Sequence, residues 1–388
     1  MYNFDEHISR LNTSAVKTEI DCDGRPLPED VLSMWIADMD ISCAPPIIEA
    51  IKRTADRRIF GYTRFGEKPF LDALTSFYSR RHGWGINTEE LVFSCGVVSA
   101  LEAAVSALSG EGDGVIIQPP VYAPFKRTVD KYRRTLIENP LIKLPGGSYE
   151  MDFGDLEKKA ALPGAKLMIL CSPHNPAGRV WSEAELRRVY EICSKNKIVL
   201  ISDEIHCDLG RGEVKNTALL RLFPRAQDIV VCCAPTKSFN IAGMGVSFSV
   251  CPSSELREKL RFAIGECLIN PISIAAATAA YAECEDWLDE LKAYIDGNFA
   301  YLRQLLAERL PEAKMAPTEG TYLAWVDFSA YRADSLAFER ELIEKGRLSL
   351  EAGARFGTGG EGFMRICLAC PRDFIKDAVE RIVRTLEL

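Results

Sequence analysis

The sequence predicts an α/β protein with a large domain and a smaller α+β domain. The large domain is expected to hold a mostly parallel (mixed) sheet between helices. Between residues 90 and 250, short continuous apolar runs alternate with amphipathic helical patterns. Strands of a parallel sheet covered on both faces have this pattern, because neither of their faces meets water. A length of 388 residues allows two domains that share a large core.

Five apolar runs are the predicted strands of the large domain. They are Leu91–Ser94, Val115–Ile117, Leu167–Cys171, Ile198–Ile201 and Ile229–Ala234. Each run is followed by a turn and then by a helical pattern. After the third run, Ser182 and Glu185 have the spacing of a capping box, which predicts the start of a helix.

The two ends of the chain are expected to form the small domain. Trp287–Leu306 has the pattern of a long amphipathic helix that joins the two domains, and strand-like runs follow at Thr321–Phe328 and Phe363–Cys370. The expected divisions are residues 1–45 for an N-terminal arm and part of the small domain, 46–285 for the large domain, and 286–388 for the C-terminal small domain.

Composition and charge restrict the class of protein. Hydrophobic residues make up 47% and charged residues 26%, as in ordinary globular domains. The net charge of −8 argues against nucleic-acid or membrane-surface partners. We find no signal peptide and no apolar run near the roughly 18 residues of a spanning helix, so we expect a cytoplasmic protein.

Cysteine and histidine spacing suggests neither disulfides nor a metal. The thirteen cysteines are scattered, many of them in apolar runs, which is typical of free thiols in a reducing compartment. The four histidines lack the spacings of metal-binding motifs, so we expect no metal site.

Lys237 is unusual because it stands in an otherwise apolar stretch, Cys233–Gly245. Burial disfavours the ammonium form and lowers the pKa of a lysine, which suits an amine nucleophile or a Schiff-base lysine. The alternative is a lysine that extends from a loop into solvent.

Other polar residues and a glycine turn follow the predicted strands in order: Gly96, Tyr122, Asn175 and Asp203. Ligands of open parallel sheets bind at the carboxyl ends of the strands. Taken singly, each residue could serve a turn, a helix cap or the core. Together with Lys237 they match what pyridoxal 5'-phosphate requires, namely a Schiff-base lysine, a carboxylate for the pyridine nitrogen, a stacking aromatic ring, an amide and phosphate-binding backbone amides.

Longer motifs extend this match. Ser172–Gly178, Ile201–His206 and Thr236–Asn240 together resemble the fold-type I pyridoxal-phosphate enzymes of the aminotransferase class I/II superfamily. Four further stretches most resemble its MalY/PatB-type cystathionine β-lyases, a group of C–S lyases: Trp35–Asp40, Phe60–Tyr62, Asp203–His206 and Cys370–Arg372.

The resemblance implies a role for each site residue. Lys237 would be the catalytic lysine, Asp203 would pair with the pyridine nitrogen, Tyr122 would stack on the ring, and Asn175 would contact its phenolic oxygen. The phosphate would be held by Gly96, Val97, Val98 and Thr236. His206 would also lie at the cofactor, where most aminotransferases have a tyrosine, which favours the lyase branch. Tyr62 would reach in from a second subunit, which implies a homodimer with shared active sites.

Arg365 lies in a run that is otherwise apolar, Phe363–Ala369. A buried guanidinium needs an anion, and a carboxylate matches its two parallel donors. We expect Arg365 and Asn175 to bind the substrate α-carboxylate. The alternative is a structural pair of Arg365 with a buried acid.

The resemblance predicts an enzyme that acts on a small amino acid. The expected reaction is α,β-elimination of L-cystathionine or another L-cysteine S-conjugate to a thiol, pyruvate and ammonia. An aminotransferase of the same fold, which would share the cofactor residues, is the first alternative, and a regulatory protein that binds the cofactor is the second. Which thiol leaves remains open at this point.

Overall fold

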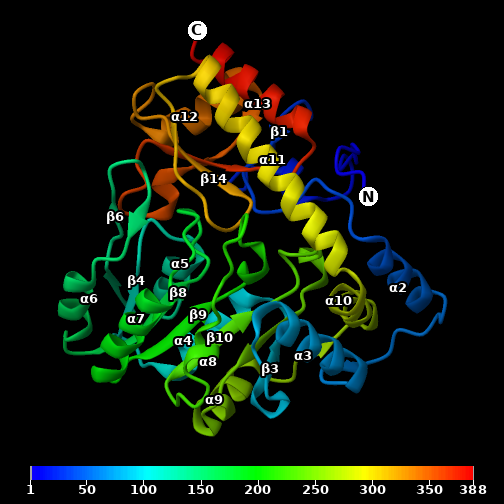
Figure 1. Cartoon of the computed structure of the whole chain (residues 1–388), viewed down its shortest axis with the longest axis vertical. Helices are drawn as coiled ribbons and strands as arrows, with labels where there is room; N and C mark the ends of the chain where they lie inside the picture. The colour runs from blue at the N-terminus through cyan, green and yellow to red at the C-terminus, as the bar shows by residue number, and fades with distance from the viewer. Residues whose placement is uncertain (1, 388) are drawn as a thin grey trace.

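A seven-stranded mixed sheet forms the centre of the larger lobe in the computed structural model, which describes residues 2–387 (Figure 1). The strand order is β3, β11, β10, β9, β8, β4, β5. Strand β11 runs antiparallel to both of its neighbours, and the other adjacent strands are parallel. The strands are β3 (Leu91–Ser94), β4 (Gly114–Ile117), β5 (Thr135–Glu138), β8 (Ala165–Cys171), β9 (Val199–Asp203), β10 (Ile229–Cys233) and β11 (Ser247–Val250).

The predicted α/β fold class is confirmed, and the five predicted strands correspond to β3, β4, β8, β9 and β10. The capping box of Ser182 and Glu185 is also present, at the start of α7. Two strands of the sheet were not predicted. Strand β5 lies at an edge and ends in a charged residue, and β11 alternates serine with apolar residues, so neither forms a continuous apolar run.

Helices cover both faces of this sheet. They are α2 (Pro45–Ala55), α3 (Lys68–His82), α4 (Val97–Leu108), α5 (Pro124–Lys131), α6 (Phe153–Ala160), α7 (Glu183–Lys195), α8 (Leu219–Leu222), α9 (Ser254–Ile264) and α10 (Pro271–Glu283). Alternate residues of β10 show the two faces: Val230 and Cys232 pack with α4, α5 and α9, whereas Val231 and Cys233 pack with α3, α7 and α10. Burial on both faces explains the continuous apolar runs of the sequence.

The smaller lobe contains a four-stranded antiparallel sheet in the order β13, β14, β17, β16. Its strands are β13 (Lys314–Met315), β14 (Leu323–Asp327), β16 (Glu351–Ala352) and β17 (Phe363–Cys367), and its helices are α12 (Ser335–Glu341) and α13 (Arg372–Thr385). Helix α11 (Glu285–Arg309) extends from α10 across to this lobe (Figure 1). Among residues 2–387, none of the helices is long and apolar enough to cross a membrane.

The N-terminal segment packs with the smaller lobe. Strand β1 (Leu32–Ser33) pairs with β15 (Leu348–Ser349). The remaining α-helix and strands are short: α1 (Val16–Glu19), β2 (Thr63–Arg64), β6 (Ile142–Lys143), β7 (Tyr149–Glu150) and β12 (Leu268–Ile269). Five further short helical turns are η1 (Thr88–Glu90), η2 (Cys207–Leu209), η3 (Ala242–Met244), η4 (Leu342–Gly346) and η5 (Gly353–Phe356). The domain divisions at residues 46 and 286 stay a prediction.

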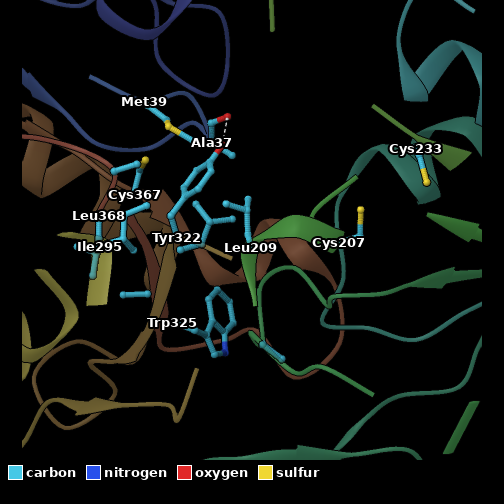
Figure 2. Packing of buried hydrophobic residues seen from close by; sticks show 14 of the residues in the cluster. Ala37, Met39, Cys207, Leu209, Cys233, Ile295, Tyr322, Trp325, Cys367 and Leu368 are labelled. Carbon is cyan, nitrogen blue, oxygen red and sulfur yellow. Dashed lines mark hydrogen bonds between the residues drawn. The ribbon is translucent and has the colours of Figure 1, made fainter. Parts of the chain in front are cut away.

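A buried tyrosine connects the smaller lobe to the N-terminal segment. The Tyr322 hydroxyl, next to β14, donates a hydrogen bond of 3.1 Å to the carbonyl of Ala37. Figure 2 shows the Tyr322 ring directed at Ala37, with Met39 and Cys367 beside it. These side chains are all buried, so the N-terminal segment is part of the core rather than a loose arm.

A buried ion pair fixes the loop that carries Lys237. His82, at the end of α3, lies 2.7 Å from the carboxylate of Asp208, which also accepts a 2.5 Å hydrogen bond from the hydroxyl of Ser238. The thiol of Cys207 lies within 4.8 Å of the two charged groups. Our expectation of no metal site stays a prediction.

The ion pair sets the protonation state of His82. Burial would lower the pKa of His82, but the hydrogen bond and charge of Asp208 outweigh burial and raise this pKa to about 10. A raised pKa means that the ion pair stabilises the fold fully below pH about 6.5, the unfolded value, and that this contribution is lost as pH rises through about 10.

We therefore predict that His82→Gln lowers the free energy of unfolding by about 3–5 kcal/mol near pH 6, because it leaves Asp208 buried and unpaired. Denaturant titrations should show the difference from wild type narrowing as pH rises from about 6.5 to about 10. Arg80→Gln is the control, since Arg80 pairs with Glu285 at the surface and its loss should cost less than about 1 kcal/mol. A difference that is independent of pH would contradict this assignment.

Candidate active site

A cavity of about 660 Å³ opens at the carboxyl ends of the parallel strands. Ten of the residues expected at the cofactor and substrate line it: Gly96, Val97, Val98, Tyr122, Asn175, Asp203, His206, Thr236, Lys237 and Arg365. The structure therefore brings together every predicted site residue except Tyr62. The roles of these residues stay predictions.

One end of the cavity is suited to an anion. Gly96 has φ = +124° and precedes α4, and its N–H donates a 2.9 Å hydrogen bond to the hydroxyl of Ser247. This φ disfavours side chains, so the turn requires glycine. The first amides of α4, including those of Val97 and Val98, have no partner within the helix and lie at the positive end of the helix dipole. With the buried Thr236 hydroxyl, they could hold a phosphate.

Lys237 is half-buried in the middle of the site. Its Nζ donates a 2.5 Å hydrogen bond to the carbonyl of Ala37, the same carbonyl that accepts from Tyr322. Burial lowers the pKa of Lys237, and the charge of Arg365 lowers it further, whereas the carboxylate of Asp38 opposes these effects. The lysine does not extend into solvent, so the alternative stated above is wrong.

Asp203 lies at the end of β9, and its side chain accepts a 3.2 Å hydrogen bond from the N–H of Ile205. Burial raises the pKa of Asp203 to about 7, because this hydrogen bond and the charge of Lys237 offset only part of the lost hydration. A carboxylate in this position can accept a hydrogen bond from a cationic N–H, and such a partner would return its pKa toward the ordinary range.

His206 is neutral in this environment. Burial, together with the charges of Lys237 and Arg365, lowers the pKa of His206 to about 3. Its ring packs edge-on against Tyr322, with 6.0 Å between the centroids. Its buried Nδ1 has no hydrogen-bond partner among residues 2–387.

Tyr122 and Asn175 come from two different loops that are joined through the backbone. The N–H of Tyr122 donates a 3.0 Å hydrogen bond to the carbonyl of Asn175. Burial raises the pKa of the Tyr122 hydroxyl to about 12, so this ring is uncharged. The Asn175 side chain accepts a 3.0 Å hydrogen bond from Nη1 of Arg365, which fixes the orientation of its amide.

Arg365, on β17, is 3% exposed and already has an acidic partner. Its Nη2 pairs with Glu351 and donates to the carbonyl of Trp35 at 2.8 Å. Its Nε is buried and has no partner among the described residues. The structural pair that we considered as an alternative is therefore present, and the Nε donor remains for a ligand.

Tyr62 lies away from this cavity. Its side chain is 93% exposed, beside the ribbon that β2 forms with β12. Within one chain Tyr62 does not reach the site, so its expected role requires a second subunit and stays a prediction.

Sequence reasoning missed three groups at the site: the Ala37 carbonyl, Tyr322 and Glu351. Ala37 lies within the Trp35–Asp40 motif, which could have drawn attention to it. Tyr322 and Glu351 carry no local signal, because they reach the site only through the pairing of the small-lobe strands.

The residues present fit pyridoxal 5'-phosphate. A half-buried lysine with a lowered pKa, a buried carboxylate with a raised pKa and a helix start suited to an anion surround one cavity. The unpartnered Arg365 Nε and His206 Nδ1 indicate that this cavity is built for a polar ligand.

Comparison with known proteins agrees with this geometry. Residues 29–382 match the family described as Aminotransferase class I and II. The chain is 41% identical to cystathionine beta-lyase PatB of Bacillus subtilis, over 99% of this chain and 100% of the relative. It is 30% identical to protein MalY of Escherichia coli, over 100% and 99%.

A solved structure agrees as well. Cystalysin from Treponema denticola, described as containing a pyridoxal 5'-phosphate cofactor, is 35% identical. It superposes with a TM-score of 0.95 over 100% of this chain and 99% of that one. The chain belongs to the aminotransferase class I and II family.

Proposed function

We propose that this chain is a pyridoxal-phosphate-dependent carbon–sulfur lyase of the cystathionine β-lyase type. Its reaction is the α,β-elimination of L-cystathionine, or of another L-cysteine S-conjugate, to a thiol, pyruvate and ammonia. The observation that carries this proposal is the position of Lys237, which has a lowered pKa and lines the same cavity as Asp203 and Arg365. The names of its relatives, including cystathionine beta-lyase PatB, support the same reaction.

When bound, pyridoxal 5'-phosphate supplies an aldehyde for the substrate amine and an electron sink for charge that develops at the substrate Cα. The amides of Val97 and Val98, with the Thr236 hydroxyl, would hold the phosphate. Gly96, whose own N–H is bonded to Ser247, would shape the turn that presents them. Asp203 would keep a proton on the pyridine nitrogen, since a buried carboxylate gains most from a cationic partner.

The other cofactor contacts come from uncharged groups. Tyr122 would stack on the ring, and the amide of Asn175 would donate to the phenolic oxygen while its oxygen stays bonded to Arg365. His206 would add polarity without adding charge, because its pKa is lowered to about 3.

Lys237 would move the proton at the substrate Cα. A base must be neutral to accept a proton, and the lowered pKa of Lys237 increases its neutral fraction near pH 7. The Ala37 carbonyl holds Nζ in place through one hydrogen bond, which leaves the lone pair of the amine free to face the cavity.

Arg365 would bind the substrate α-carboxylate through its free Nε. Its contacts with Glu351, Trp35 and Asn175 hold the guanidinium plane still, so the donor is presented in one orientation. An ordered donor loses less conformational freedom when the substrate binds.

We also propose a homodimer with shared active sites. Ile59, Phe60 and Tyr62 are 79%, 57% and 93% exposed, and large apolar side chains that protrude together are typical of a covered surface. A second copy of the chain would cover them, and Tyr62 would reach the phosphate end of the partner's cavity.

We place the protein in the cytoplasm. All thirteen cysteines are free thiols, although several lie close together in the fold. Free thiols persist in a reducing compartment, which supports this assignment.

We predict that the purified protein releases pyruvate and a thiol together from L-cystathionine, with no keto acid added. Lys237→Ala should lower the rate on the order of 10²–10⁴-fold, because it removes the group that moves the Cα proton. The control is Lys259→Ala, a surface lysine paired with Glu255, which should retain the wild-type rate. Turnover that requires a keto acid would instead identify an aminotransferase.

We predict that Arg365→Gln raises KM for L-cystathionine and lowers kcat/KM on the order of 10- to 100-fold, because a charged hydrogen bond to the substrate is lost. The matched variant is Glu351→Gln, which keeps the cation and removes the competing carboxylate. It should leave KM unchanged or lower it. Equal losses of kcat/KM in both variants would assign Arg365 to the structural pair alone.

We predict that Tyr62→Ala and Lys237→Ala subunits, each with low activity alone, recover activity when they are mixed and refolded together. Shared sites would give about a quarter of the wild-type rate, because half of the dimers are mixed and each contains one intact site. Two different affinity tags would verify that mixed dimers form. Mixed dimers without recovered activity would contradict the shared site.

A further inference from the structure

Two cysteine side chains meet at the phosphate end of the cavity. The Sγ atoms of Cys95 and Cys267 lie 3.3 Å apart, although the residues are 172 positions apart in the chain. Cys95 lines the cavity and directly precedes Gly96. Cys267 lies in the short connection between α9 and β12. We infer that Cys95 and Cys267 form a reversible disulfide that acts on the phosphate-binding turn.

The geometry requires only a small movement. A disulfide has a sulfur–sulfur distance of about 2.05 Å, so the 3.3 Å separation must close by about 1.3 Å. Both residues lie outside helices and strands, and each has a glycine with positive φ nearby, Gly96 and Gly265. Such connections adjust more easily than residues within regular elements.

The two thiols differ in reactivity. Cys95 is exposed and lines the cavity, so an oxidant in solvent reaches it first. Cys267 is half-buried, and burial and the hydrogen bond with Cys95 raise its pKa to about 12. Cys95 is therefore the attacking thiol, and Cys267 is the thiol that resolves the intermediate.

Hydrogen peroxide can serve as the oxidant. The Cys95 thiolate attacks one peroxide oxygen, the O–O bond breaks, and a sulfenic acid and hydroxide form. The Cys267 sulfur then attacks the sulfenic sulfur, an S–S bond forms, and the sulfenic oxygen leaves as water with the Cys267 proton. Two thiols lose two electrons and two protons, and one peroxide becomes two molecules of water.

The other cysteines are less accessible to an oxidant. Among the thirteen, all within the described residues, Cys95 is the exposed one. Cys207 and Cys233 point toward each other in Figure 2, but both are buried in the core. Exposure and a neighbouring sulfur coincide at Cys95, and this combination is typical of redox-sensitive cysteines.

The disulfide would tie two functional segments together. One is the turn at Gly96, whose amides would hold the cofactor phosphate. The other is β12, which pairs with β2 beside Tyr62. This consequence rests on the proposed function. A displacement of about 1 Å in a positioning element can cost on the order of 10²-fold in rate, so we expect the oxidised enzyme to lose at least about tenfold in activity.

The test treats the holoenzyme with hydrogen peroxide and maps its peptides without reduction. We expect the Cys95 peptide linked to the Cys267 peptide, two fewer free thiols per chain, and an activity that dithiothreitol restores. Cys267→Ser should have wild-type activity before treatment and should form no link. The part of its inactivation that dithiothreitol reverses should be at least about tenfold smaller than in the wild type. Cys43→Ser, which removes another half-buried thiol, is the matched control and should respond as wild type does.

Three outcomes would overturn the inference. The first is a Cys95 sulfinic acid without a link, and the second is a link between other thiols. The third is a Cys95–Cys267 link that leaves activity unchanged, which would remove the effect on the phosphate-binding turn. Peptide mapping does not depend on turnover, so a protein that forms the link but never releases pyruvate would contradict the proposed function and not the disulfide.

Discussion

One backbone carbonyl connects the three parts of the molecule that build the site. Ala37 accepts hydrogen bonds from Lys237 of the larger lobe and from Tyr322 of the smaller lobe. The segment that carries Ala37 is itself held by a buried ion pair, in which Lys17 lies 2.5 Å from Asp40 and donates to the carbonyl of residue 38 at 2.7 Å. The position of Lys237 therefore depends on the N-terminal segment as much as on its own loop.

Burial determines the charge state of the site, and it acts in opposite directions on acids and bases. It lowers the pKa of Lys237 and His206 and raises that of Asp203, because it disfavours every charged form. The chain alone thus holds a lysine with a lowered pKa, a neutral imidazole and an acid that titrates near pH 7. A ligand that brings both a cationic N–H and a phosphate would supply the charges that these groups lack, which explains why the residues suit this cofactor.

The sequence predicts the large sheet and most of the site for one physical reason. In a covered parallel sheet the strands are continuous apolar runs, and their carboxyl ends meet at one edge, so Asn175, Asp203 and Lys237 could be brought together without a structure. Tyr322 and Glu351 could not be predicted, because a separate sheet brings Tyr322 against Ala37 and His206 and brings Glu351 to the cavity.

The ion pair between Arg365 and Glu351 neutralises a guanidinium that is buried beside the cavity. A buried guanidinium without an anion would cost several kcal/mol, and Glu351 supplies that anion within the fold. Burial raises the pKa of Glu351, the charge of Arg365 opposes burial, and the charge of Glu339 adds to it. In the proposed function, Arg365 would keep this structural partner and meet a substrate α-carboxylate through its unpartnered Nε.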